Sequence, residues 1–145
     1  MPGVWGITPR ESVEAECRRL GKEAVVAGCV DALAGRDVDN ALLLALGGPH
    51  ASLVLGGRAG GRYGHWPRVW AARGLLYAWD DVATRAVIAA TSDTAWRVRE
   101  MAVKVIAHHR LGNALGAAAK LQADPVERVR TAARRAVRIL AEAHA

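Results

Sequence analysis

The second half of the chain repeats one pattern of apolar positions at a spacing of about thirty residues. The segments "MAVKVI" (101–106) and "AARRAV" (132–137) align at a spacing of thirty-one, and "AARGLL" (71–76) precedes the first by thirty. In the two later copies the apolar residues recur four, seven and eight positions after the first, which is one face of an α-helix. These residues are Val98, Ala102, Val105 and Ile106, matched by Val129, Ala133, Ala136 and Val137. Each copy therefore predicts an amphipathic helix.

Polar residues and glycines indicate where helices begin and end. Thr8 can cap a helix that starts at Pro9, and Glu11 completes a capping box. No segment alternates polar and apolar residues for long enough to predict a strand. We therefore expect an all-α fold with helices at about 9–20, 22–34, 41–46, 49–55, 66–79, 81–91, 96–109, 112–123 and 126–143.

A pair of helices that recurs at this period is typical of an α-solenoid. One pair cannot bury its apolar face alone, whereas stacked pairs bury a continuous core. The repeat places Asp93 and Asp124 directly before a first helix, where a carboxylate can cap free amides and face the positive end of the helix dipole. Arg99 and Arg130 follow the core valines, and we expect each to reach the turn aspartate of a neighbouring repeat.

Two segments resemble the first-helix pattern of the HEAT repeat family: Asp93…Val98-Arg99…Ala102 and Asp124-Pro125…Val129-Arg130…Ala133. The resemblance covers residues 66–143. It implies a short, right-handed HEAT-like solenoid of stacked helical hairpins, whose second helices line a concave face. It also implies a binding scaffold as the default role. The first copy departs from the pattern, because Trp70 stands where the family has arginine.

We expect a single domain over residues 1–145, in which residues 8–55 form an irregular helical cap. The glycine-rich segment 56–65, "GGRAGGRYGH", has no apolar periodicity and predicts a loop. Arginines placed among glycines, as in this segment, are also typical of segments that bind single-stranded nucleic acid. The alternative, which we favour, is a flexible connector.

The net charge of +6 is unevenly distributed. Residues 1–96 contain ten Lys/Arg and ten Asp/Glu, whereas residues 97–145 contain ten Lys/Arg and four acids. Such asymmetry suggests a surface for an anionic partner. Several of these cations occupy equivalent repeat positions or share one helix face, and they form a candidate phosphate-contacting surface: Arg97, Lys104, Arg128, Arg134, Arg135 and Arg138. The alternative is an ordinary solvated face. The HEAT resemblance also implies that these residues, which lie on first helices, line the convex side or edge of the stack and not its groove.

Tryptophans provide a second candidate surface. Trp66 and Trp70 lie four residues apart and share a helix face beside the glycine-rich segment. They either fill the core or form an exposed patch that anchors a partner. In the second case we expect Trp70 to be the most exposed, because its repeat equivalents, Glu100 and Thr131, are polar.

Candidate catalytic residues are few. Asp80-Asp81 follow Trp79, and a DNA glycosylase family built on HEAT-like repeats uses an aspartate near tryptophans, which makes such an enzyme the weakest of our hypotheses. A helix cap at Asp81 explains the same residue without chemistry. His108 and His109 are adjacent on a helix and point in different directions, so they do not form a chelating pair. We expect no cofactor and no metal.

Composition narrows the remaining possibilities. No apolar run is long enough to cross a membrane, and Met1–Trp5 does not start a signal peptide. We therefore expect a cytoplasmic protein in which Cys17 and Cys29 are free, buried thiols. The pattern favours a non-catalytic scaffold with a protein partner, and nucleic-acid binding through residues 97–138 is the alternative.

Overall fold

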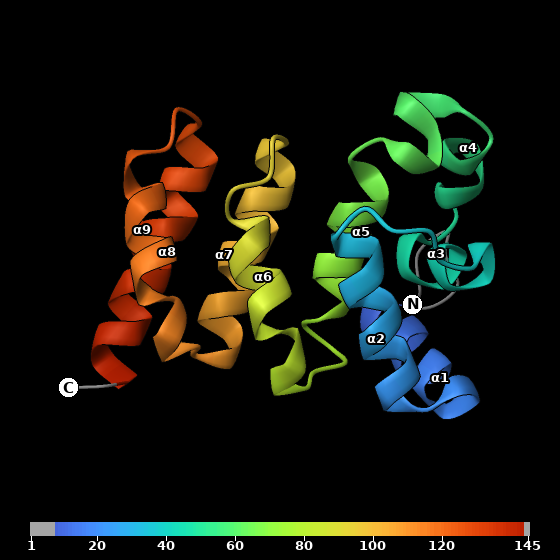
Figure 1. The fold of residues 1–145 in the computed structure, drawn as a ribbon, viewed down its shortest axis with the longest axis horizontal. Helices are drawn as coiled ribbons and strands as arrows, with labels where there is room; N and C mark the ends of the chain where they lie inside the picture. Colours follow the sequence, from blue (N-terminus) through green and yellow to red (C-terminus); the bar gives the residue numbers. More distant parts are fainter. Residues whose placement is uncertain (1–7, 144–145) are drawn as a thin grey trace. The chain divides into compact units, whose positions relative to one another are not determined.

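The computed structural model describes residues 8–143, and the segment Met1–Trp5 lies outside this range. The prediction of an all-α fold is confirmed, because the described residues form α-helices, short 3-10 turns and loops without a strand. Two compact units divide the chain: Met1–Ala83, or unit 1, and Thr84–Ala145, or unit 2. Figure 1 shows the helices of unit 1 in blue to green and those of unit 2 in yellow to red.

Unit 1 begins with the predicted capping box. Helix α1 (Pro9–Leu20) is capped by Thr8, whose Oγ1 accepts a hydrogen bond from the Glu11 amide at 3.2 Å, while Oε1 of Glu11 accepts one from the Thr8 amide at 3.3 Å. The later helices of the unit are α2 (Lys22–Leu33), α3 (Asn40–Gly47), α4 (Ala51–Leu55) and α5 (Trp66–Gly74).

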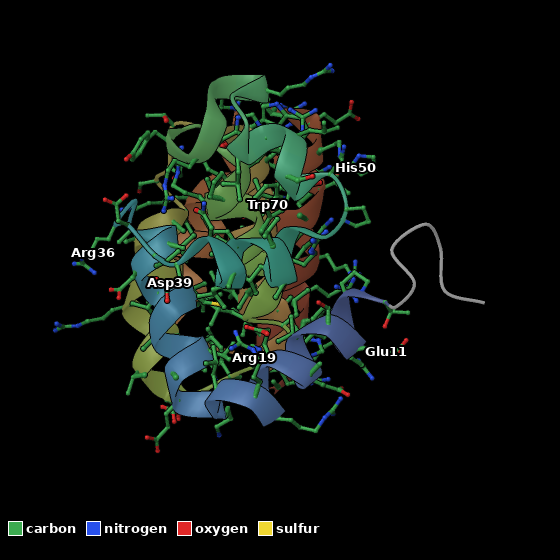
Figure 2. All side chains as sticks on the ribbon, turned by 90° about the vertical axis from the view of Figure 1, so that its right-hand side faces the viewer. Glu11, Arg19, Arg36, Asp39, His50 and Trp70 are labelled. Atoms are coloured by element: carbon green, nitrogen blue, oxygen red, sulfur yellow. The ribbon has the colours of Figure 1, made fainter. Side chains whose placement is uncertain are left out.

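Trp70 lies in the core of unit 1, so of the two interpretations the core holds for it, and its place in an exposed patch was wrong. Its side chain is 5% exposed, and Figure 2 shows it among the packed helices, with Arg36 and His50 at the rim. The reason is that α5 packs on α2 and α3. A Cβ atom on Gly47 of α3 would lie only 2.7 Å from the Trp70 ring, so the missing side chain makes room for the indole.

The glycine-rich segment is held against the preceding turn. It forms a 3-10 stretch, Arg58–Tyr63, with left-handed backbone at Ala59 and at the two glycines that follow it. Arg62 donates hydrogen bonds to Oδ1 of Asn40 at 2.5 Å and to the carbonyl of Val38 at 2.7 Å. These bonds fix one side of the segment to the start of α3.

Helix α5 ends five residues earlier than expected, at Gly74 instead of residue 79. The amides of Leu76 and Tyr77 bond carbonyls three residues back, so the chain continues in tight turns. A Cβ atom at position 74 would lie 2.8 Å from Leu46, which shows how closely the backbone approaches α3 here. Packing, which local periodicity does not reveal, therefore sets the end of this helix.

Unit 2 contains α6 (Thr84–Ala90), α7 (Trp96–His109), α8 (Leu115–Lys120) and α9 (Glu127–Ala143). The long helices α7 and α9 pack on each other, and α8 packs on α9 (Figure 1). Val98, Ala102, Val129 and Ala133 are fully buried, as the repeated apolar pattern predicted. The predicted helix over residues 112–123 is instead a short α-helix between two 3-10 turns.

Two further properties concern the described residues. None of their helices is both long enough and apolar enough to span a membrane.

The two cysteines are free thiols. Cys29 is buried, and Cys17 is half-buried instead of buried as expected. Burial, followed by the proximity of Cys17, raises the pKa of the Cys29 thiol to about 12.

Candidate binding surface on helices α7 and α9

The turns that precede α7 and α9 are built in the same way. Oδ1 of Asp93 accepts a hydrogen bond from the Ala95 amide at 2.8 Å, and Oδ1 of Asp124 accepts one from the Val126 amide at 2.9 Å. Each carboxylate thereby satisfies a backbone donor near a helix start. One arginine of each helix returns to its own turn. Nη1 of Arg99 donates to the Asp93 carbonyl at 2.9 Å, and Nη1 of Arg130 donates to the Asp124 carbonyl at 2.8 Å.

Arg99 also joins the two turns, as the repeat predicted. Its Nε donates to Oδ2 of Asp124 at 2.8 Å and its Nη2 to Oδ1 at 3.2 Å. The side chains are 14% and 3% exposed, respectively, so the pair is largely shielded from water. The hydrogen bonds from Arg99, together with that from Val126, hold the pKa of Asp124 below its ordinary value, although burial acts in the opposite direction.

Arg130 does not make the side-chain contact that we expected. It bonds the main chain of its own turn, because the described residues contain no further turn beyond α9 that could present an aspartate to it. Arg99 and Arg130 thus both donate to the carbonyl of their own turn, whereas only Arg99 also binds the aspartate of the other turn.

The ring of Trp96 contacts two of the predicted basic residues. The guanidinium carbon of Arg97 lies 4.4 Å from the centre of the Trp96 ring system, and that of Arg128 lies 5.1 Å from it. Both distances lie within the range of cation–π attraction. The indole of α7 therefore helps to position a cation from α9 beside a cation of its own helix.

Glu100 pairs with two cations of the same surface. Its buried carboxylate accepts hydrogen bonds from Nε and Nη2 of Arg128 at 3.0 and 3.1 Å, and Nζ of Lys104 lies 3.8 Å from it. The Arg128 side chain remains 66% exposed. The pairing with Glu100 therefore fixes its guanidinium without removing it from solvent.

A groove of about 450 Å³ lies between these helices. The half-buried side chain of Ala132 and that of Ala107, which is only 3% exposed, form its apolar part. Charged and polar residues surround them: Glu100, Lys104, Glu127, Arg128, Thr131 and Arg135. We call this concave area with its rim the α7–α9 face. It has a small apolar centre between cations, which is the chemistry of a binding site for an amphipathic anionic ligand.

The two remaining predicted cations lie outside the groove. Arg134 and Arg138 are exposed on α9, and Nη2 of Arg134 donates to the hydroxyl of Thr131 at 3.3 Å. They extend the positive surface of unit 2, which contains eleven Lys/Arg and five Asp/Glu. Unit 1 contains nine of each, so the whole net charge of +6 belongs to unit 2.

The other candidates lie in unit 1 and have structural contacts. Trp66 is half-buried with its ring next to that of His65, and Trp70 is in the core. The indole N–H of Trp79 donates to Oδ1 of Asp81 at 3.1 Å. The cap that we predicted for Asp81 is instead made by Asp80, which accepts from the Val82 amide at 3.0 Å.

Two residues that position the cations of this surface, Glu100 and Trp96, were not predicted as site residues. In the sequence analysis Glu100 served only as a polar equivalent of Trp70. A signal for Glu100 was present, because the repeat aligns it with Thr131, and Arg128 lies one helical turn before Thr131. Adjacent packed helices therefore bring the acid and the arginine close together.

Comparison with protein family models, characterised proteins and solved structures gives no match for this chain.

Proposed function

We propose that this chain is a non-catalytic, HEAT-like binding module, and that it binds a protein partner through the α7–α9 face. One observation carries the proposal: a groove of about 450 Å³ with an apolar centre lies between cations, of which Arg128 is held in place by Glu100 and Trp96. A preformed concave surface of this kind needs little ordering when it binds, and so more of the contact energy contributes to affinity.

The repeated turns support the HEAT-like part of the proposal. Asp93 and Asp124 accept equivalent amide hydrogen bonds, and Arg99 and Arg130 donate equivalent bonds to the carbonyls of those turns. An array of repeats uses such equivalent contacts to place successive helices in register. On this view α7 and α9 are the first helices of two adjacent repeats, so the α7–α9 face lies on the side opposite the concave face that second helices would line.

The charges of the face favour binding over catalysis. The two buried carboxylates of unit 2, Glu100 and Asp124, are both paired with arginines. A general acid or base needs a pKa near the working pH, whereas the pKa of Asp124 is held below its ordinary value. Asp124 therefore acts as a structural charge, and the carboxylate of Glu100 is occupied by its contacts with Arg128 and Lys104.

A protein partner fits the groove better than a nucleic-acid backbone does. Alanine side chains at positions 107 and 132 offer an apolar contact that phosphates do not use, and Glu127 places a carboxylate on the rim. One observation nevertheless supports nucleic-acid binding as a second candidate, since the whole surplus of positive charge lies in unit 2.

Site-specific photo-crosslinking tests the favoured function. A photoreactive amino acid at Thr131, on the rim of the groove, should capture a protein from cell extract. The same group at Gln122, which is exposed outside the groove lining, is the matched control. Capture at neither position, or equally at both, would argue against the α7–α9 face as the binding surface.

Titration with duplex DNA separates the two candidates. We expect no binding at about 50 mM salt. If DNA binds instead, its affinity should fall steeply with salt, and Arg134→Glu with Arg138→Glu should reduce that salt dependence by about one log unit for each lost phosphate contact. Salt-dependent DNA binding that these two substitutions weaken would favour nucleic-acid binding over a protein partner.

A further inference from the structure

The α7–α9 face has a spacing of charges that identifies the chemistry of its partner. Arg128 and Arg135 line the groove seven residues apart on α9, which is about two helical turns or 10 Å along the axis. Ala132 lies between them, and Lys104 of α7 lines the same groove. Along α9 the lining therefore presents Glu127 and Arg128, then Thr131 and Ala132, and then Arg135, so that an arginine borders the apolar contact on each side.

The cations differ in how far they are already engaged. Nε and Nη2 of Arg128 are bonded to Glu100, and its Nη1 donates no hydrogen bond within residues 8–143. Arg135 is exposed and has no ion pair in the same part of the chain. Both therefore retain donors for carboxylates of a ligand, and charge-assisted bonds of this type are the stronger ones.

A helix fits this geometry. Two packed helices leave a groove between their side-chain ridges, and a third helix can lay its own ridge into it. On such a helix, residues i and i+7 lie on one face about 10 Å apart, and residues i+3 and i+4 lie between them on the same face. This spacing matches that of Arg128, Ala132 and Arg135.

Resting on the proposed function, we infer that the α7–α9 face binds an acidic amphipathic helix that carries carboxylates at positions i and i+7 and leucine-sized apolar side chains between them. The apolar side chains would contact Ala107 and Ala132, and the two carboxylates would meet Arg128 and Arg135. Charge complementarity selects this occupant, because each end of the apolar contact is bordered by an arginine of the groove lining.

The direct test uses fluorescently labelled synthetic helices and the full chain. The probe has glutamates at i and i+7 with leucines at i+3 and i+4. A permuted peptide of the same composition places the glutamates off that face. We expect a Kd on the order of 10 μM for the probe and binding at least about tenfold weaker for the permuted peptide. Equal binding of the two would overturn the inference.

Matched variants locate the contact. Arg135→Glu should weaken binding of the probe by about tenfold or more, since it replaces attraction by repulsion inside the groove. Lys120→Glu makes the same change of charge on exposed α8 and should alter binding by less than about twofold. Likewise Thr131→Trp should block the groove, whereas Gln122→Trp should not. Equal effects within either pair would contradict a specific groove.

The outcomes also separate this inference from the proposed function. If both peptides bind equally and Arg135→Glu weakens both, the face binds acidic proteins without the proposed register. If neither peptide binds while Thr131 still crosslinks a protein, the partner has another chemistry. If duplex DNA binds and the peptides do not, both proposals fail together.

Discussion

Replacement of Asp124 by alanine should be among the most destabilising single changes in unit 2. The carboxylate accepts two hydrogen bonds from Arg99 and one from the Val126 amide, and its side chain is only 3% exposed. Asp124→Ala therefore removes a helix cap and a shielded ion pair together. The loss reaches both turns, since Arg99 also bonds the carbonyl of Asp93.

The magnitude follows from these contacts. Loss of the cap costs about 1 kcal/mol, and removal of one partner of a buried ion pair costs about 3–5 kcal/mol. Arg99 keeps its carbonyl bonds at 2.9 and 3.2 Å, so its guanidinium is not left without partners. We therefore expect the free energy of unfolding to fall by about 3–4 kcal/mol for Asp124→Ala and by about 2–3 kcal/mol for Arg99→Ala.

A double-mutant cycle isolates the ion pair. Asp124→Ala and Arg99→Ala combined should be less damaging than the sum of the single effects, with a coupling energy of about 2 kcal/mol. Arg130 is the matched control, because its bond goes to the Asp124 carbonyl, which survives replacement of the side chain. Its coupling with Asp124 should stay below about 0.5 kcal/mol.

Urea unfolding supplies the measurement. Circular dichroism follows unfolding of the whole chain. The NMR signal of the Trp96 indole N–H follows unit 2, because Trp96 is the only tryptophan in residues 84–145. Additive effects of Asp124→Ala and Arg99→Ala would refute the reasoning, and so would a stronger coupling to Arg130 than to Arg99.

The remaining predictions concern pH, packing and thiol reactivity. Because the folded-state pKa of Asp124 is lowered, its contribution to stability is present above its unfolded pKa of about 3.9 and is lost as the pH falls through the folded value. Urea midpoints measured below about pH 4 should therefore converge for the parent and Asp124→Asn, and a constant gap would contradict this. Ala102→Leu or Ala133→Leu should cost about 1–3 kcal/mol by overpacking, since both sites are fully buried; parent-like melting would show that they tolerate larger side chains. A thiol reagent at neutral pH should label Cys17 and spare Cys29 in the folded chain, because the Cys29 thiol is buried with a pKa of about 12, whereas equal labelling would argue against its burial.

Local patterns predicted the features that depend on neighbours in sequence. The capping box of Thr8 and Glu11 is present because its two partners are three residues apart. The contact between Arg99 and Asp124 was also foreseeable, although 25 residues separate them, because the repeat defines which positions of adjacent copies face each other.

Features set by packing between unlike segments were not predictable in this way. Trp70 was compared with Glu100 and Thr131 as if α5 had the surroundings of α7 and α9. In fact it packs against Gly47, which belongs to no repeat. Glu100 is buried despite its charge, because Arg128 compensates it from another helix. The groove depends on such pairings, so the three cations that line it could be predicted from the sequence, whereas its shape could not.

The bridge made by Arg99 also affects how α9 can detach from the rest of unit 2. A helix held only by local hydrogen bonds frays from either end, one turn at a time. Here the first turn of α9 is tied through Asp124 to α7, so it can open only when that long-range bond breaks as well. Fraying should therefore start at the C-terminal end of α9. The turns before α7 and α9, although distant in sequence, should exchange their amide hydrogens together as parts of one cooperative unit.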